Sequence, residues 1–260
     1  MPDCAPVLRC RSHTFAERPI AMQVCTYYEC VFSSGRAAFE AFKNVGRSDA
    51  LWEEAKGLQL GRAMGVGGGN GFSIWPDFKR YAFIMLWDSE EHARDYFCSS
   101  KAMLWYRQHA SEYLHFVLRP TRAQGAWGGV QPFDQQQAMD SEGPLVVLTR
   151  ATIRAARLLE FWKHVPRTSR FMSEAEGVMH RVGIGEYPLF MQATVSMWES
   201  RKALMNAAYK NTVHADIVKL TRERNWYSEE LFAQFEVIGS QASGAHYAEV
   251  PTIGEGFFGA

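Results

Sequence analysis

The sequence predicts an α+β fold in which two tandem ferredoxin-like units, each with the element order β-α-β-β-α-β, form an intramolecular dimeric α+β barrel. Two observations support this prediction. Trp87-Asp88-Ser89 recurs as Trp198-Glu199-Ser200, and each copy ends an apolar run and begins a long helical pattern. A glycine-bounded apolar stretch and a proline precede each tryptophan, at 57–76 and 177–188. An element order shared by two segments of about a hundred residues indicates internal duplication.

The first unit is assigned to residues 23–121. Apolar or alternating runs indicate its strands, and apolar residues three and four positions apart indicate its helices. Asp88-Ser89 provides an N-cap signature for its second helix. The predicted elements are, in order, a strand at 23–32, a helix at 35–55, strands at 58–66 and 80–87, a helix at 91–111 and a strand at 113–118.

The second unit, residues 144–240, repeats this order. Pro166 lies within its first helical pattern and should end or kink that helix, because proline lacks the backbone donor. The predicted elements are a strand at 145–153, a helix at 157–172, strands at 177–185 and 189–197, a helix at 201–224 and a strand at 231–238.

Three further segments complete the chain. Residues 1–22 read as a flexible leader, 122–143 as a linker interrupted by glycines, and 241–260 as a tail. The linker should wrap around the core, because Trp127 and Phe133 need a place to bury. Helices cover one face of each antiparallel sheet, so the other face needs a partner, and the second sheet supplies it. A monomer is then sufficient to close the barrel, and a homodimer of such monomers is compatible with it.

Composition narrows the classes of function. The 28 basic and 28 acidic residues cancel, and no dense basic run suggests nucleic-acid binding. No run approaches the roughly 18 apolar residues of a spanning helix and no signal peptide is apparent, so we expect a cytoplasmic protein. P-loop, nucleophile-elbow and zinc-ligand motifs are absent, and the glycine-rich stretch 65–71 precedes no helix, as a dinucleotide site would require.

His214 is the histidine that we single out among eight. Helical spacing places it beside Ala207 and Val218, at the border of an apolar stripe that should face the sheet. A neutral imidazole there, among small residues, is suited to be the axial ligand of haem iron. The alternative is a partly buried histidine that is hydrogen-bonded to a backbone carbonyl.

Several other polar residues are candidates for the same site. Three arginines lie on strands that are otherwise apolar, where they need an anionic partner: Arg62, Arg150 and Arg181. That partner is either a haem propionate or a carboxylate such as Glu186 or Glu230. His180 alternates with Arg181 along one strand, so one of the two should face the cavity between the sheets. Tyr227 and Glu230 could deliver a hydrogen bond or a proton at a cavity rim.

Stretches of both units follow the pattern of one known family. They are 148–154, 161–166, 183–189, His214 with 226–232, and, in the first unit, 71–72, 106–112 and 125–133. Together they resemble the spheroidene monooxygenase family, the carotenoid 2-ketolases of purple phototrophic bacteria, and the resemblance spans about residues 23–240.

This resemblance implies an oxidoreductase that uses haem b, O2 and electrons from a ferredoxin-type donor. Such an enzyme hydroxylates one carbon of an acyclic carotenoid twice, and the gem-diol collapses to a ketone. His214 would be the iron ligand, with Val218, His180, Arg62 and Arg150 as cofactor contacts. Arg181, Tyr227 and Glu230 would be catalytic. Because carotenoids reside in membranes, we also expect an apolar entrance or peripheral membrane contact.

Two other functions stay open at this point. The tandem arrangement also resembles aldoxime dehydratases, which implies a haem-dependent lyase, and a non-catalytic barrel that binds haem or another small ligand is the third reading. One departure from the family concerns the last strand, where Ala233-Gln234-Phe235 replaces an expected Ala-Arg-Phe. The change removes a cation that a propionate could meet.

Overall fold

The computed structural model describes residues 22–69, 73–136, 142–173, 175–187, 189–210, 212–254 and 257. At 166–173, 209–210, 212–216 and 218 it describes the backbone and not the side chains. The leader predicted at 1–22 therefore lies outside the described residues, apart from Met22.

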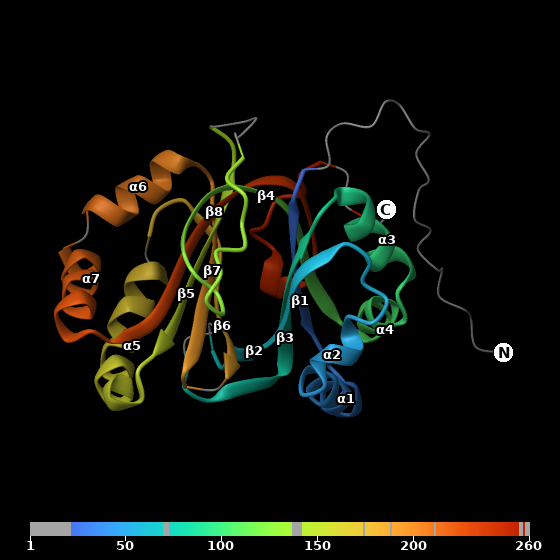
Figure 1. The fold of residues 1–260 in the computed structure, drawn as a ribbon, viewed down its shortest axis with the longest axis horizontal. Helices are drawn as coiled ribbons and strands as arrows, with labels where there is room; N and C mark the ends of the chain where they lie inside the picture. Colours follow the sequence, from blue (N-terminus) through green and yellow to red (C-terminus); the bar gives the residue numbers. More distant parts are fainter. Residues whose placement is uncertain are drawn as a thin grey trace.

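Eight antiparallel strands form a closed barrel in the order β1-β3-β2-β6-β7-β5-β8-β4 (Figure 1). In the chain, β1 to β4 belong to the first unit and β5 to β8 to the second, so the predicted α+β barrel of two β-α-β-β-α-β units is confirmed. The strands are β1 Val24–Val31, β2 Leu58–Gly67, β3 Pro76–Trp87, β4 Glu112–Gly125, β5 Leu145–Ile153, β6 Val178–Tyr187, β7 Met191–Trp198 and β8 Tyr227–Ser243.

The helices lie outside the barrel, those of the first unit on one side and those of the second unit on the other (Figure 1). None of the helices in the described part of the chain is long and apolar enough to cross a membrane. They are α1 Gly35–Val45, α2 Ser48–Leu51, α3 Glu90–Ser99, α4 Lys101–His109, α5 Leu158–Ser173, α6 Arg201–Lys210 and α7 Thr212–Arg224, with short 3-10 turns η1 Ala155–Arg157 and η2 Ala245–Tyr247.

Most of the long helices predicted from the sequence are pairs of shorter ones. The helix expected at 91–111 breaks at Ser100, whose backbone is extended and whose hydroxyl accepts a hydrogen bond from the Met103 amide at the start of α4. In contrast, α5 continues through Pro166 to Ser173, so the helix does not end at the proline. It packs against β6 and α7, and such tertiary packing can outweigh a local propensity cost.

Two seams join the units. β4 and β8 pair over nearly their whole length, from Tyr113 opposite Ser243 to Gly125 opposite Leu231. The other seam, between β2 and β6, is short and pairs Gly65 with Gly185 and Val66 with Ile184. Because of the long seam, β4 extends to Gly125, into the segment predicted as linker, and β8 starts before and ends after the predicted 231–238.

The barrel interior is one apolar core to which both units contribute. Phe116 from β4 and Phe235 from β8 are essentially inaccessible to solvent. Trp127 and Phe133 of the segment between the units are also buried in this core, as predicted for two large aromatic side chains. Tyr247, in η2 after the last strand, joins the same cluster and brings the tail to the barrel.

Candidate functional site

The sequence repeat fixes which residues of the two units correspond. Val24 pairs with Trp87 in the first unit, and Leu145 pairs with Trp198 in the second. Counting along the paired strands from these residues matches each position of one sheet with a position of the other. The comparison shows where the second unit departs from the first.

The outer faces of the two sheets, which lie beneath the helices, differ sharply in side-chain size. In the first unit, Tyr28 and Phe83 are 0% and 1% exposed and form a ring cluster with helix residues such as Tyr106. The corresponding residues of the second unit are Thr149, which is exposed at the centre of β5, and Thr194, which is half-buried. Two large rings are therefore replaced by two small hydroxyl side chains.

The helix–sheet core of the second unit is correspondingly small. Its buried members are Leu145, Val147, Trp198 and Ala203, all towards one end of the sheet. Beyond them, α7 contacts both α5 and α6, while α5 touches β6 and α6 touches β7. The remaining sheet surface, around Thr149 and Thr194, is the candidate binding site, because it offers a flat surface of small side chains beneath helices.

His214 and Val218 lie on α7, which borders this site, and their side chains are outside the described part of the chain. Their relation to the site comes from the repeat. α4 begins at Lys101 and α7 at Thr212. Met103 and His214 each lie two residues after these starts, so they correspond in the repeat. Met103 is 1% exposed and packs in the helix–sheet core of the first unit.

Arg181 is the one predicted arginine on the outer face of the sheet. It pairs with Ser196, which matches Met85 of the first unit's helix-covered face. Its counterpart is Gly61, where an added Cβ would lie 2.8 Å from the Trp52 ring. Desolvation by partial burial lowers the pKa of the Arg181 guanidinium. The second unit thus carries a cation where the first carries a tryptophan packed on a glycine.

Tyr227 and Glu230 lie at the start of β8, next to the C-terminal half of α7. Burial raises the pKa of the Tyr227 phenol, which also shares a side-chain hydrogen bond with Thr221 of α7. Glu230 forms an ion pair with Arg222 of α7 at 2.6 Å. Both residues therefore connect β8 to the helix that carries His214.

The structure places Arg62 and Arg150 inside the barrel, across the sheet from α7. Arg62 Nε lies 3.1 Å from Glu186 Oε2. Arg150 pairs with Glu229, and its Nε lies 3.7 Å from Glu186 Oε1. Both guanidinium groups lie 5.6 Å from the ring of Trp127. Both arginines therefore have carboxylate partners, Glu186 as predicted and Glu229 rather than the predicted Glu230.

His180 also faces the barrel interior, so it does not share a side of the sheet with Arg181. Its Nε2 lies 3.2 Å from Glu29 Oε2. Arg80 and the hydroxyl groups of Tyr27 and Tyr247 contact the same carboxylate at 2.5, 2.6 and 3.0 Å. A ligand held between the sheet and α7 would lie across the sheet from His180, Arg62 and Arg150.

The cluster around Glu29 is the feature that sequence reasoning missed. Burial alone would raise the pKa of Glu29, but hydrogen bonding and the charge of His180, together with the charge of Arg80, lower it to about 2. A signal was present, because Glu29 is the single charged residue in the apolar strand from Val24 to Phe32.

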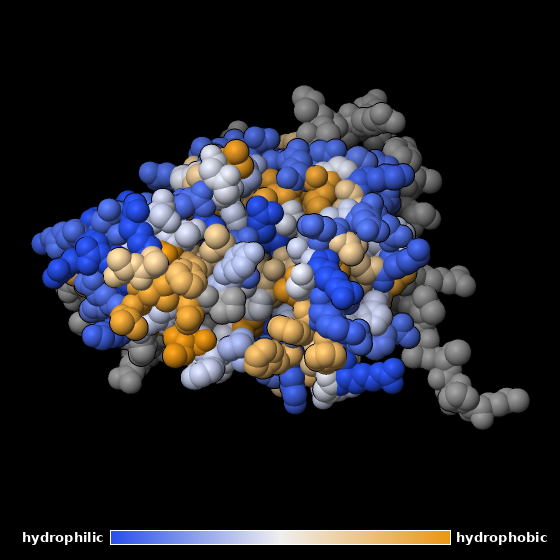
Figure 2. All heavy atoms as spheres, turned by 60° about the horizontal axis from the view of Figure 1, so that its bottom comes forward, coloured by the Kyte–Doolittle hydropathy of each residue, from blue (hydrophilic) through white to orange (hydrophobic). Residues whose placement is uncertain are grey.

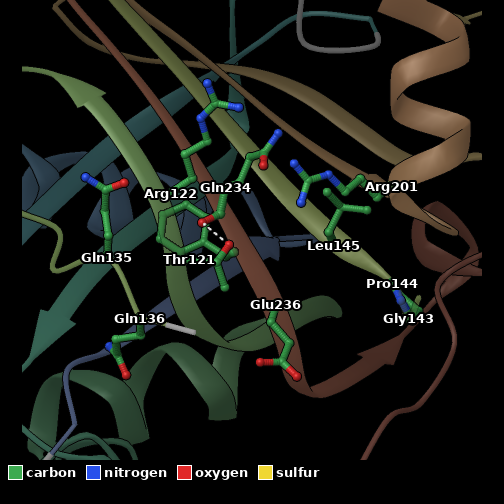
Figure 3. Close-up of a pocket in the computed structure, with 11 residues that line it drawn as sticks. Thr121, Arg122, Gln135, Gln136, Gly143, Pro144, Leu145, Arg201, Gln234 and Glu236 are labelled. Atoms are coloured by element: carbon green, nitrogen blue, oxygen red, sulfur yellow. Dashed lines mark hydrogen bonds between the residues drawn. The ribbon is translucent and has the colours of Figure 1, made fainter. Parts of the chain in front are cut away.

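A surface pocket of about 340 Å³ is lined by residues of β4 and β8 and by Arg201, the first residue of α6 (Figure 3). Arg122 and Gln234 are direct partners across the β4–β8 ladder. Both of their side chains line this pocket. At the last strand, where the sequence has Gln234 in place of an expected arginine, the neighbouring strand therefore supplies a cation.

Among the described residues, no group of three or more His, Cys, Asp or Glu side chains could hold a metal ion. A haem iron differs from such sites because the porphyrin supplies most of its ligands and a single protein side chain suffices. The relevant test is therefore whether the protein offers a flat, enclosed space beside one ligand position.

Comparison with solved structures identifies the class of fold. The chain superimposes on aldoxime dehydratase with a TM-score of 0.58 at 12% identity, covering 84% of this chain and 82% of that one. A complex of aldoxime dehydratase with butyraldoxime gives a TM-score of 0.56 at 11% identity, covering 85% and 81%. At this level of identity the likeness concerns the fold, a tandem α+β barrel. No family model matches the sequence.

Sequence comparison identifies the family. The chain is 38% identical over 182 residues to spheroidene monooxygenase of Rhodobacter capsulatus, covering 69% of this chain and 75% of the relative. It is 30% identical over 191 residues to spheroidene monooxygenase of Rubrivivax gelatinosus, covering 74% and 72%. The chain belongs to the spheroidene monooxygenase family, as its sequence motifs predict.

Proposed function

We propose that this protein is a haem-dependent monooxygenase that oxidises an acyclic carotenoid or a similar apolar molecule with O2 and electrons from a ferredoxin-type donor. The reaction class and the substrate class follow from the family, whose matched members are spheroidene monooxygenases. The observation that carries the haem assignment is the replacement of Tyr28 and Phe83 by Thr149 and Thr194 on the second unit's outer sheet face.

The residues present fit a haem. A porphyrin is flat and largely apolar, and it needs a surface without large projecting side chains. Thr149, Thr194 and the buried Gly183 and Ser196 provide such a surface on three strands of one sheet. When bound, a haem supplies the activation of O2 that a hydrocarbon oxidation requires.

His214 is the proposed iron ligand, with Val218 one helical turn further along α7. The repeat supports this choice, because the matching residue Met103 points into the helix–sheet core of the first unit. A side chain directed in the same way from α7 would face the small-residue surface. The first unit fills this position with packing, whereas the second would use it for ligation.

Arg181, Tyr227 and Glu230 are the proposed catalytic residues of this site. Arg181 projects from the outer, helix-covered face of the sheet, where its guanidinium can donate hydrogen bonds to a polar group. The Tyr227 phenol is protonated near neutral pH and can donate a hydrogen bond, and burial raises its pKa further above the ordinary value. Glu230, held by Arg222, can accept a proton at the rim.

Replacement of the proposed ligand tests the cofactor. Purified protein produced with ample haem should show a Soret band, and His214→Ala should lose it. His109→Ala is the matched control, because His109 is an exposed histidine at the end of α4. Absence of a Soret band from the wild-type protein, or its persistence in His214→Ala, would contradict the assignment.

The alternatives are separated by what the reaction consumes. A lyase of the aldoxime dehydratase type, with which this chain shares its fold, removes water and consumes neither O2 nor reductant. We expect turnover of an acyclic carotenoid only when O2 and a reduced ferredoxin are both supplied. Turnover of an aldoxime under anaerobic conditions would favour the lyase, and haem binding without either activity would favour a non-catalytic barrel.

A further inference from the structure

One end of the molecule carries most of its exposed large apolar side chains. Four elements meet there, at the bottom of Figure 1: α1, the β2–β3 connection, the start of α5 and the β6–β7 turn. The side chains include Trp75 at 75% exposure, Phe78 and Phe39 at 60%, Leu159 at 83% and Phe190 at 43%. With this end turned forward, Figure 2 shows apolar groups gathered in its lower part.

The internal repeat explains why these elements share one end. α1 and α5 follow the first strand of their units, and the β2–β3 and β6–β7 connections link the second and third strands of each. Equivalent elements of both units therefore contribute to the same surface. The rings of Phe42 in α1 and Phe78 in β3 pack edge to face, with their centroids 5.9 Å apart, and this contact joins two of the elements.

Such a gathering of exposed large apolar side chains is typical of a surface that contacts a partner, because soluble monomers rarely leave large apolar patches open to water. Aromatic side chains on protruding turns are typical of protein that contacts the boundary between lipid headgroups and acyl chains. Cations accompany them: Arg36 on α1, Lys79 beside Phe78 and Arg154 after β5 are exposed. None of the three forms an ion pair within the described part of the chain, so their charges are available to anionic lipid.

This surface also adjoins the candidate site. The Trp162 indole of α5 donates a hydrogen bond to the Leu189 carbonyl at the β6–β7 turn, at 3.3 Å. The backbone amide of Ile153, at the end of β5, donates to the Phe190 carbonyl at 2.8 Å. α5, β5 and β6 therefore lead directly from the exposed side chains to the surface around Thr149.

We propose that this end of the barrel docks onto an anionic lipid bilayer, with Trp75, Phe78 and Phe190 inserted among the headgroups. If the proposed function holds, an apolar substrate would pass from the bilayer to the sheet surface around Thr149 without crossing water. A second copy of the chain fits this end less well, because the exposed cations of one copy would face the same cations of the other.

The test is co-sedimentation of the full-length protein with vesicles of phosphatidylcholine alone and of phosphatidylcholine mixed with phosphatidylglycerol. The wild-type protein should bind the mixed vesicles. The triple variant Trp75→Ser, Phe78→Ser, Phe190→Ser should bind at least about tenfold more weakly, because it loses apolar area that enters the interface. The double variant Arg36→Gln, Lys79→Gln should lose the preference for anionic lipid.

The matched control is Leu104→Ser, which removes an apolar side chain of 42% exposure from α4, an element outside the four that form this end. Unchanged circular dichroism establishes that the variants are folded. Unchanged Soret absorbance separates the result for vesicle binding from the cofactor assignment. The proposal is overturned if the wild-type protein does not bind mixed vesicles or if the triple variant binds as the wild type does. It is also overturned if the triple variant abolishes a wild-type dimer and has no effect on vesicle binding.

Discussion

At the residue scale, the ionised carboxylate of Glu29 organises the barrel interior. It is 0% exposed and accepts hydrogen bonds from Tyr27, Arg80, His180 and Tyr247. These donors come from β1, β3, β6 and η2, which are elements of both units and of the tail. One charge therefore ties together parts of the chain that are far apart in the sequence.

Removal of this charge should be costly. Glu29→Gln keeps the side-chain volume but leaves Arg80, itself 7% exposed, without its counter-charge. We expect a loss of about 3–5 kcal/mol in the free energy of unfolding, measured by urea denaturation at pH 7. Glu90→Gln, which breaks the exposed pair with Arg94, is the control and should cost less than about 1 kcal/mol. Similar losses in both variants would show that the Glu29 cluster adds little.

The same carboxylate should make stability depend on acid. Its pKa is lowered from 4.5 to about 2 by folding, so the folded state favours the ionised form. The stabilisation is fully present above pH 4.5 and is lost as the pH falls towards 2. The difference in unfolding free energy between the wild-type protein and Glu29→Gln should therefore shrink over this range. A difference that stays constant down to pH 2 would contradict the assignment.

At the element scale, the duplication and the order of strands and helices could be predicted from the sequence, because apolar periodicity and the repeated Trp-acidic-Ser segments mark both. Which face of the sheet each polar side chain occupies could not be predicted. Alternation along β6 shows that His180 and Arg181 point in opposite directions, but both faces of the sheet are covered, one by helices and one by the second sheet. Periodicity does not distinguish two buried faces.

The Glu29 cluster could not be predicted for a related reason, because its partners come from separate elements that only the closed barrel brings together. His214 stays a prediction, drawn from the amphipathic pattern of its helix and from the comparison with Met103 that the repeat supplies. Local patterns thus indicate the helix that borders the candidate site, while the contacts inside the barrel depend on topology.

The small side chains on the second sheet lead to a prediction about the whole element. Thr149→Tyr restores the ring that the first unit has at Tyr28 and should fill the space proposed for haem. We expect the Soret band to be lost while circular dichroism and the melting temperature stay near their wild-type values. Thr149→Val, which keeps the side chain small, should retain the band. Haem binding by Thr149→Tyr would show that the cofactor lies elsewhere.

At the scale of the whole molecule, the two units should not unfold separately, because they share the core inside the barrel. The interior cluster draws on strands of both units, and the β4–β8 seam is longer than any strand pairing within a unit. A repeat that could have produced two independent domains has produced one closed sheet. Cooperative unfolding of all eight strands is the expected consequence.

This expectation is tested with one core substitution in each unit. Phe116→Ala in β4 and Phe235→Ala in β8 each remove a fully buried ring from the shared interior and should cost about 3–5 kcal/mol. Both variants should show a single calorimetric transition shifted to lower temperature, since loss of either ring weakens the core on which both units depend. Leu104→Ala, on the surface of α4, should leave the transition in place. Two transitions, each moved only by the substitution in its own unit, would mean that the halves fold as separate domains in spite of their common sheet.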